Sequence, residues 1–179
     1  MPLTGVNVTV DNRDSGWSGS HSGISGHADG YGVDSLKLSV GQVGIYTPNL
    51  PAEGIYELQV WVSGGGSALD PAARYTISGT GGATIESFDQ NTEPGEWYTL
   101  GSYEFAAGES GSVSVERTTS DRTAIADAIR WVYLIPQIAS FSVRESGAQK
   151  CEGTAGGSGL KSPNAERVRI VRGSGMNGS

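Results

Sequence analysis

The fold is decided by the stretch Ile125-Ala126-Asp127-Ala128-Ile129-Arg130-Trp131, which runs on into Val132-Tyr133-Leu134 and stops before Pro136. It is the most apolar and most β-prone run of the sequence, rich in β-branched and aromatic side chains that suit a half-buried pleated surface. At about 10 residues it is too short to span a membrane as a helix, which needs about 20. We therefore predict that it forms the central strand, with the other strands packed around it.

One carboxylate, Asp127, lies near the middle of this stretch. A buried acid must accept hydrogen bonds or sit beside a cation, because it loses its hydration. We expect Asp127 to be buried and structural, in a polar network with Asp11 and Asp89. A catalytic pair of Asp89 and Asp127 stays open as an alternative, because glycoside hydrolysis needs only two carboxyls at a set separation.

The rest of the sequence is typical of an all-β protein. The chain has 28 glycines, no window repeats apolar residues at helical spacing for three turns, and period-two alternation recurs. We predict an antiparallel, jelly-roll-like β-sandwich with a Gly-rich C-terminal extension. Residues 36–40 and 43–46 should form a hairpin through Gly41-Gln42, and alternation along 55–62 places Trp61 on the polar face. Further strands are predicted at residues 6–10, 74–78, 83–88, 96–105 and 112–116.

Charge divides the chain into two parts. Residues 1–136 carry sixteen acidic and six basic side chains, whereas residues 137–179 carry six basic and three acidic ones. We predict a sandwich domain over 1–136 and a low-complexity extension over 137–179, with short strands at 138–143 and 168–171, that is held by partner protein subunits. The acidic body argues against nucleic acid as a partner, since such binding relies on Lys and Arg. Cys151 is the single cysteine and excludes an internal disulfide.

The motifs of common enzymes are absent. There is no Gly-x-Ser-x-Gly, no His-Glu-x-x-His and no phosphate-binding Gly-x-x-x-x-Gly-Lys-Ser/Thr. Oxygen ligands at Asp11 and Asp14, or the loop with His21 and His27, could hold a cation, but neither spacing fits a standard site. Turn capping is the favoured reading of the first group. We predict no catalytic residues, no cofactor and no metal.

Sugar binding requires fewer specialised groups than catalysis does. An aromatic ring that stacks on a pyranose, with polar groups around it, is sufficient. The aromatic residues in or beside loops are the candidates, and Trp97 and Trp131 are expected in the core because they belong to core-like strands. The predicted ligand-binding residues are Trp17, Tyr31, Tyr46 and Trp61.

Several pieces of sequence, in order over about 125 residues, together resemble the golvesin C-terminal-like domain, which is also the xanthan-binding module of xanthan lyases. The resemblance covers residues 6–134 and implies a jelly-roll-like sandwich that attaches larger proteins to polysaccharide or cell-envelope material, without catalysis. The pieces are Val10-Asp11-Asn12, Asp14-Ser15-Gly16-Trp17, Leu50-Pro51-Ala52-Glu53-Gly54-Ile55-Tyr56-Glu57, Ala73-Arg74-Tyr75-Thr76-Ile77, Asp89-Gln90, Trp97, Leu100-Gly101-Ser102-Tyr103-Glu104-Phe105, Gly108, Gly111 and Ile125–Trp131.

Two functions follow as hypotheses. The first is a non-catalytic carbohydrate-binding or envelope-binding adhesion module, displayed on a larger protein or particle at the cell surface or outside the cell. The second is a structural or decoration subunit of a virion or surface filament, anchored by residues 137–179. The start Met1-Pro2-Leu3-Thr4 has no basic and apolar regions of a signal peptide, and the basic extension contrasts with the acidic body. Both observations motivate the second hypothesis. No membrane span is predicted.

Overall fold

The structure, a computed structural model, describes residues 6–64 and 68–134, and these residues form strands joined by turns and loops. The predictions for residues 137–179, including the short strands and Cys151, lie outside the described residues. No helix in the described part of the chain is long and apolar enough to cross a membrane.

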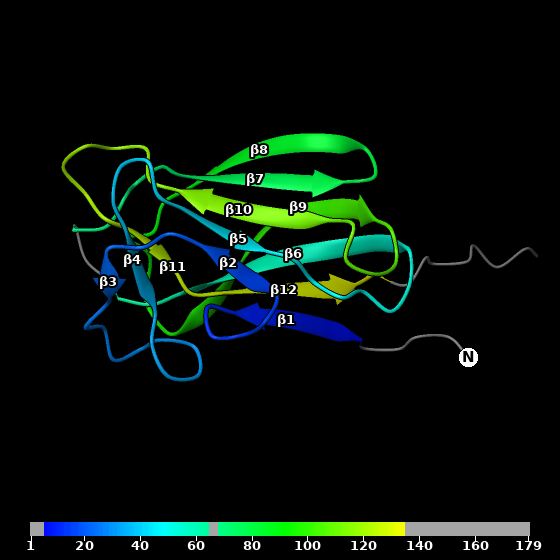
Figure 1. Cartoon of the computed structure of the whole chain (residues 1–179), viewed down its shortest axis with the longest axis horizontal. Coiled ribbons are helices and arrows are strands. Elements are labelled where there is room, and N and C mark those ends of the chain that lie inside the picture. Colours follow the sequence, from blue (N-terminus) through cyan, green and yellow to red (C-terminus); the bar gives the residue numbers. More distant parts are fainter. Residues whose placement is uncertain (1–5, 65–67, 135–179) are drawn as a thin grey trace, which may run out of the picture. The chain divides into compact units, whose positions relative to one another are not determined.

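Two antiparallel sheets and a smaller third sheet make up the fold (Figure 1). The four-stranded sheet has the order β1 (Asn7–Asp11), β12 (Ala128–Tyr133), β6 (Gly54–Val62) and β9 (Glu96–Phe105). The five-stranded sheet has the order β2 (Trp17–Gly19), β5 (Val43–Tyr46), β10 (Ser112–Glu116), β7 (Ala73–Gly79) and β8 (Gly82–Phe88). The small sheet joins β11 (Ala124–Ala126), β4 (Leu36–Leu38) and β3 (Gly23–Ile24). The predicted antiparallel β-sandwich is confirmed.

Alternation of side chains along β6 builds one side of the core. Tyr56, Leu58, Val60 and Val62 are buried, whereas Trp61 on the opposite face is only partly buried, as predicted. Trp131 of β12 is fully buried in the same core, which confirms its expected place. Burying each such side chain contributes roughly 1.5–3 kcal/mol, so this alternation fixes which face of the sheet points inward.

The stretch from Ile125 to Leu134 does not form one strand, and that prediction was wrong. It divides at Asp127 into β11, which pairs with β4, and β12, which lies between β1 and β6. The backbone carbonyl of Asp127 accepts hydrogen bonds from the Asn12 amide at 3.0 Å and from the Tyr46 hydroxyl at 3.2 Å. The polar residue therefore marks the corner at which the chain passes from one sheet to the next.

The predicted hairpin of residues 36–40 and 43–46 is also wrong. A turn is present, since the Gln42 amide donates to the Ser39 carbonyl at 3.0 Å, but the flanking strands part after it. β4 pairs with β11 and β3, while β5 pairs with β10 and β2. The turn thus connects two sheets, and the pairing partners were not encoded in the local sequence.

A β-bulge in β9 changes which face its first half presents. Leu58 of β6 lies opposite Gly101, but the next residue, Gln59, lies opposite Thr99, so Leu100 is the extra residue. A one-residue shift moves every following side chain to the other face. Trp97 consequently lies opposite Trp61 on the outer face and is partly exposed, so its predicted place in the core was wrong.

Asp70, which the sequence did not single out, anchors the loop after β10. It is fully buried, and its carboxylate accepts the backbone amides of Thr118 at 2.6 Å, Thr119 at 3.2 Å and Ala72 at 3.0 Å. Burial raises the pKa of this carboxyl, but the bonds from Thr118, Ala72 and Thr119 outweigh it and bring the pKa below its ordinary value. The charged carboxylate is therefore the form that the fold holds.

Replacing Asp70 with alanine should lower the free energy of unfolding by about 2–4 kcal/mol, because buried amides lose their acceptor. Urea unfolding followed by tryptophan fluorescence measures the loss. Asp121→Ala is the control, since the Asp121 side chain is 75 % exposed and should change stability by less than about 0.5 kcal/mol. Equal losses in the two variants would contradict the anchoring role.

Candidate functional site

Three aromatic rings meet on the outer face of the four-stranded sheet and form what we call the aromatic cluster: Tyr31, Trp61 and Trp97. Trp61 and Trp97 are cross-strand partners on β6 and β9, and Tyr31 comes from the loop between β3 and β4. The ring centroids lie 5.2–5.5 Å apart, with interplanar angles of 63–70°. This edge-to-face packing holds the rings rigidly, and each residue remains partly exposed.

Polar groups border the cluster on the same face. The Arg130 guanidinium carbon lies 4.3 Å from the Trp97 ring centroid, and Arg130 Nε donates to Gln59 Oε1 at 2.9 Å. Arg130 and Gln59 are cross-strand partners, and Gln59 is paired with Thr99 on its other side. The outer face thus presents aromatic surface beside a row of hydrogen-bonding side chains.

The loop that carries Tyr31 is tied to the sandwich at three points. The Trp61 indole donates to the Asp29 carbonyl at 2.7 Å, and the Tyr31 amide donates to both carboxylate oxygens of Asp127, at 3.1 and 3.2 Å. His27 packs against Gly64, where an added Cβ would lie 2.2 Å from the imidazole Cγ and where φ is +77°. These contacts fix the Tyr31 ring against Trp61.

A buried polar network lies behind this loop. The Asn12 side-chain amide donates to Asp34 Oδ1 at 2.8 Å, and Arg13 forms an ion pair with the same carboxylate. The hydrogen bond from Arg13 holds the pKa of Asp34 below its usual value. Asp11 also belongs to this region, and burial raises its pKa to about 6. Asp34 is a member of this network that the sequence pattern did not indicate.

Asp127 is the most deeply buried carboxyl of this network. It is 4 % exposed, and burial raises its pKa to about 7, with the charges of Asp11 and Asp34 acting in the same direction. The Ser63 side chain and the Tyr31 amide oppose this shift. Asp127 is therefore buried and hydrogen-bonded, as predicted. Asp89 does not join it, because the Asp89 carboxylate caps its own turn by accepting the Asn91 amide at 2.9 Å.

The structure brings together only two of the four predicted ligand-binding residues, Tyr31 and Trp61. Tyr46 is 1 % exposed and belongs to the core, so a ligand at the surface cannot reach it and its place in the predicted site was wrong. Trp17 is the cross-strand partner of Tyr46 in the five-stranded sheet and packs against the core. Trp97 joins the cluster instead, and the glycine at the β9 bulge was the signal that could have revealed it.

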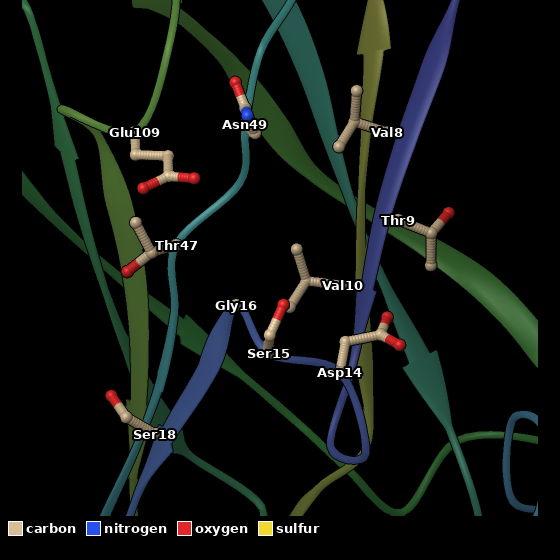
Figure 2. A pocket seen from close by; sticks show the side chains of 10 residues that line it. All are labelled: Val8, Thr9, Val10, Asp14, Ser15, Gly16, Ser18, Thr47, Asn49 and Glu109. Carbon is tan, nitrogen blue, oxygen red and sulfur yellow. The ribbon is translucent and has the colours of Figure 1, made fainter.

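A separate hollow of about 390 Å³ lies between β1 and the segment around β2 (Figure 2). Its walls carry hydroxyl, amide, carboxylate and small apolar groups, but no aromatic ring. The lining residues are Val8, Thr9, Val10, Asp14, Ser15, Gly16, Ser18, Thr47, Asn49 and Glu109. Because a sugar ring gains most from stacking on an aromatic face, the aromatic cluster is the better candidate for a sugar site.

The two loops considered for a cation have other roles in the structure. The Asp14 carboxylate caps a turn by accepting a hydrogen bond from the Asp11 backbone amide at 2.9 Å. The His21 imidazole packs edge-on against the Trp17 ring, with the two ring centroids 6.1 Å apart. Within residues 6–64 and 68–134, no group of three or more His, Cys, Asp or Glu side chains is placed to hold a metal ion.

Comparison with known proteins identifies relatives of the sandwich. The family model of the Golvesin C-terminal domain matches residues 7–133, which confirms the resemblance seen in the sequence. The chain is 32 % identical over 135 residues to xanthan lyase of Bacillus sp. (strain GL1), a match that covers 70 % of this chain and 14 % of the lyase.

Solved structures with the same fold include enzymes of which this chain covers a small part and separate carbohydrate-binding modules. Paenibacillus xanthan lyase superposes with a TM-score of 0.68 at 25 % identity, over 75 % of this chain and 14 % of the enzyme. The family 35 carbohydrate-binding module of Cellvibrio japonicus Abf62 gives a TM-score of 0.52 at 14 % identity, over 70 % of this chain and 92 % of the module. A family 35 carbohydrate-binding module from an environmental isolate gives a TM-score of 0.52 at 22 % identity, over 69 % of this chain and 90 % of the module. The chain therefore corresponds to a small part of the lyases but to nearly whole binding modules.

Proposed function

Because the chain belongs to the Golvesin C-terminal domain family, we propose that it is a non-catalytic carbohydrate-binding module and that the aromatic cluster is its binding site. The matched segment makes up 14 % of xanthan lyase, the size of an accessory part of an enzyme rather than its whole. The structural likeness to family 35 carbohydrate-binding modules supports a binding role for a domain of this size.

The observation that carries this proposal is the outward-facing pair Trp61 and Trp97. Aromatic rings offer a flat apolar face that complements the C–H face of a pyranose. The neighbouring Arg130 and Gln59 supply a guanidinium and an amide that can bond sugar hydroxyls. Since the loop contacts of Tyr31 and Trp61 already fix the rings, binding requires little ordering of side chains.

The arrangement of acids supports binding without catalysis. Asp127 is buried beneath the loop and bonded to the Tyr31 amide, while Asp89 caps an exposed turn. A glycoside hydrolase needs two carboxyls that flank one bond of the substrate, and these two carboxyls serve separate loops. We propose that the module attaches the protein that carries it to extracellular or cell-envelope polysaccharide.

Affinity electrophoresis of the full chain tests this function. Native gels cast with xanthan or with other soluble acidic and neutral polysaccharides should retard the protein in at least one case. The same mixtures should release no new reducing ends or unsaturated sugars after prolonged incubation. If no polysaccharide changes the migration of the protein, the proposed binding function is contradicted. Release of sugar products would contradict the non-catalytic assignment.

A further inference from the structure

β1 is an edge strand with a free hydrogen-bonding side. It is the first strand in the order β1-β12-β6-β9, and in Figure 1 no labelled strand lies beyond it. The Asn12 amide donates to the Asp127 carbonyl at 3.0 Å, and the Tyr133 amide donates to the Val6 carbonyl at 3.1 Å. These bonds flank the β1–β12 ladder and therefore show which of its residue pairs are hydrogen-bonded.

The alternation of bonded and non-bonded pairs decides which backbone groups of β1 are free. Residues of an antiparallel pair alternate between bonded and non-bonded positions, so Val8 and Val10 bond to β12. The amide and carbonyl groups of Asn7 and Thr9 then point away from the sheet. Within the described residues, no strand or loop takes up these groups. The corresponding groups of Asp11 are used in the turn that Asp14 caps.

The hollow of Figure 2 borders β1 on the face that carries Val8 and Val10. Val8 and Val10 form its apolar wall, and across from them lie Thr47 and Asn49, which follow β5. β2, the edge of the five-stranded sheet, borders the same hollow through Ser18. The open seam between the two sheets therefore borders the strand whose backbone has unpaired groups, and such an edge strand can accept an added strand.

Charge indicates which kind of strand fits. Asp14 and Glu109 line the hollow, and Figure 2 shows the Glu109 carboxylate near the side chains of Thr47 and Asn49. Residues 1–136 carry sixteen acidic and six basic side chains. An added strand with basic side chains is attracted by this field, whereas an acidic strand is repelled.

We propose that the free edge of β1 binds an extended peptide whose side chains alternate between basic and apolar. The backbone of the peptide pairs with Asn7 and Thr9, and its apolar side chains cover Val8 and Val10. Its basic side chains point to the opposite face, where the negative charge of the acidic body attracts them. The chain's own sequence has this alternation in Arg167-Val168-Arg169-Ile170, and a peptide that contains this segment provides the probe. This proposal is independent of carbohydrate binding.

The test measures fluorescence anisotropy of a labelled peptide of residues 165–174. The receptor is the full chain with Arg167, Arg169 and Arg172 replaced by serine, so that its own segment does not compete. Saturable binding that weakens with added salt is expected, and a peptide with serine in place of its three arginines should bind at least tenfold more weakly. Absence of binding, or equal binding of the serine peptide, would overturn the proposal.

Two variants of Thr9 locate the site. Thr9→Pro removes an outward-pointing amide without removing a bond to β12, a change that edge strands tolerate, and it should weaken binding at least tenfold. Thr9→Ala keeps the amide and should bind within twofold of the parent. Glu109→Lys, at an exposed residue, should weaken binding at least fivefold, and it provides a second test of the site if the proline variant does not fold.

Binding that neither Thr9→Pro nor Glu109→Lys weakens would overturn the site. Self-association of the unmodified chain that Thr9→Pro abolishes would support it and identify the partner as a second copy.

Discussion

Replacing Trp61 with alanine is expected to lower the affinity for the retarding polysaccharide about 30-fold, which corresponds to about 2 kcal/mol. The variant removes one of the two facing indoles of the outer face and also the bond from the indole to the Asp29 carbonyl, which helps to hold the Tyr31 loop. Both losses act on the same site, because Tyr31 would lose one of the two rings against which it packs. Isothermal titration calorimetry, or the dissociation constant from affinity gels, measures the change.

Two controls separate loss of the ring from other effects. Trp61→Phe keeps an aromatic face but loses the indole donor, so it should bind within about fivefold of the wild type. Ile85→Ala removes an apolar side chain that is 63 % exposed on β8 of the other sheet, and it should leave binding unchanged. Wild-type affinity in Trp61→Ala, or an equal loss in Ile85→Ala, would show that the sugar binds elsewhere.

Replacing Asp127 with asparagine is expected to change how stability depends on pH. Burial raises the pKa of Asp127 in the folded chain to about 7, above an ordinary value of 3.8. The folded state therefore favours the protonated acid. Its contribution to the free energy of unfolding is fully present below about pH 4 and is lost as the pH rises through 7, in total on the order of 4 kcal/mol.

Asparagine does not titrate, so the variant lacks this loss. The wild type should exceed the variant in stability by more at pH 5 than at pH 9, and urea unfolding of both proteins at pH 5, 7 and 9 measures the difference. Polysaccharide affinity at pH 5 should change less than about threefold, because the asparagine oxygen can still accept the Tyr31 amide. A stability difference that grows with pH would show that the fold favours the ionised carboxylate instead.

Much of the sandwich follows from local pattern. The alternation in β6 correctly assigned its buried face and the outward position of Trp61, because one buried face forces the register of a strand. The pairing of the strands did not follow from the local pattern. The turn at residues 39–42 looks like a hairpin turn, but β4 and β5 belong to different sheets, and that choice depends on partners far away in the sequence.

The candidate site was predictable in part. Trp61 followed from alternation and Tyr31 from its place in a long loop. Trp97 was assigned to the core because it belongs to a core-like strand. Period-two counting back from Phe105 gives the same face, since it does not include the extra residue at Leu100. Tyr46 lies near a strand end, where sequence does not reveal that β5 is covered on its inner face. The role of Asp127 as the acceptor for the Tyr31 amide joins residues 96 positions apart, a contact that no local pattern contains.

The most direct test of the aromatic cluster as the binding site uses the four tryptophan indole N–H signals in a ¹⁵N–¹H NMR spectrum, each assigned by a single Trp→Phe variant. Titration with an oligosaccharide of the retarding polysaccharide should shift the signals of Trp61 and Trp97 and leave that of the fully buried Trp131 in place. Saturable binding that shifts the Trp17 signal while those of Trp61 and Trp97 stay fixed would contradict the assignment.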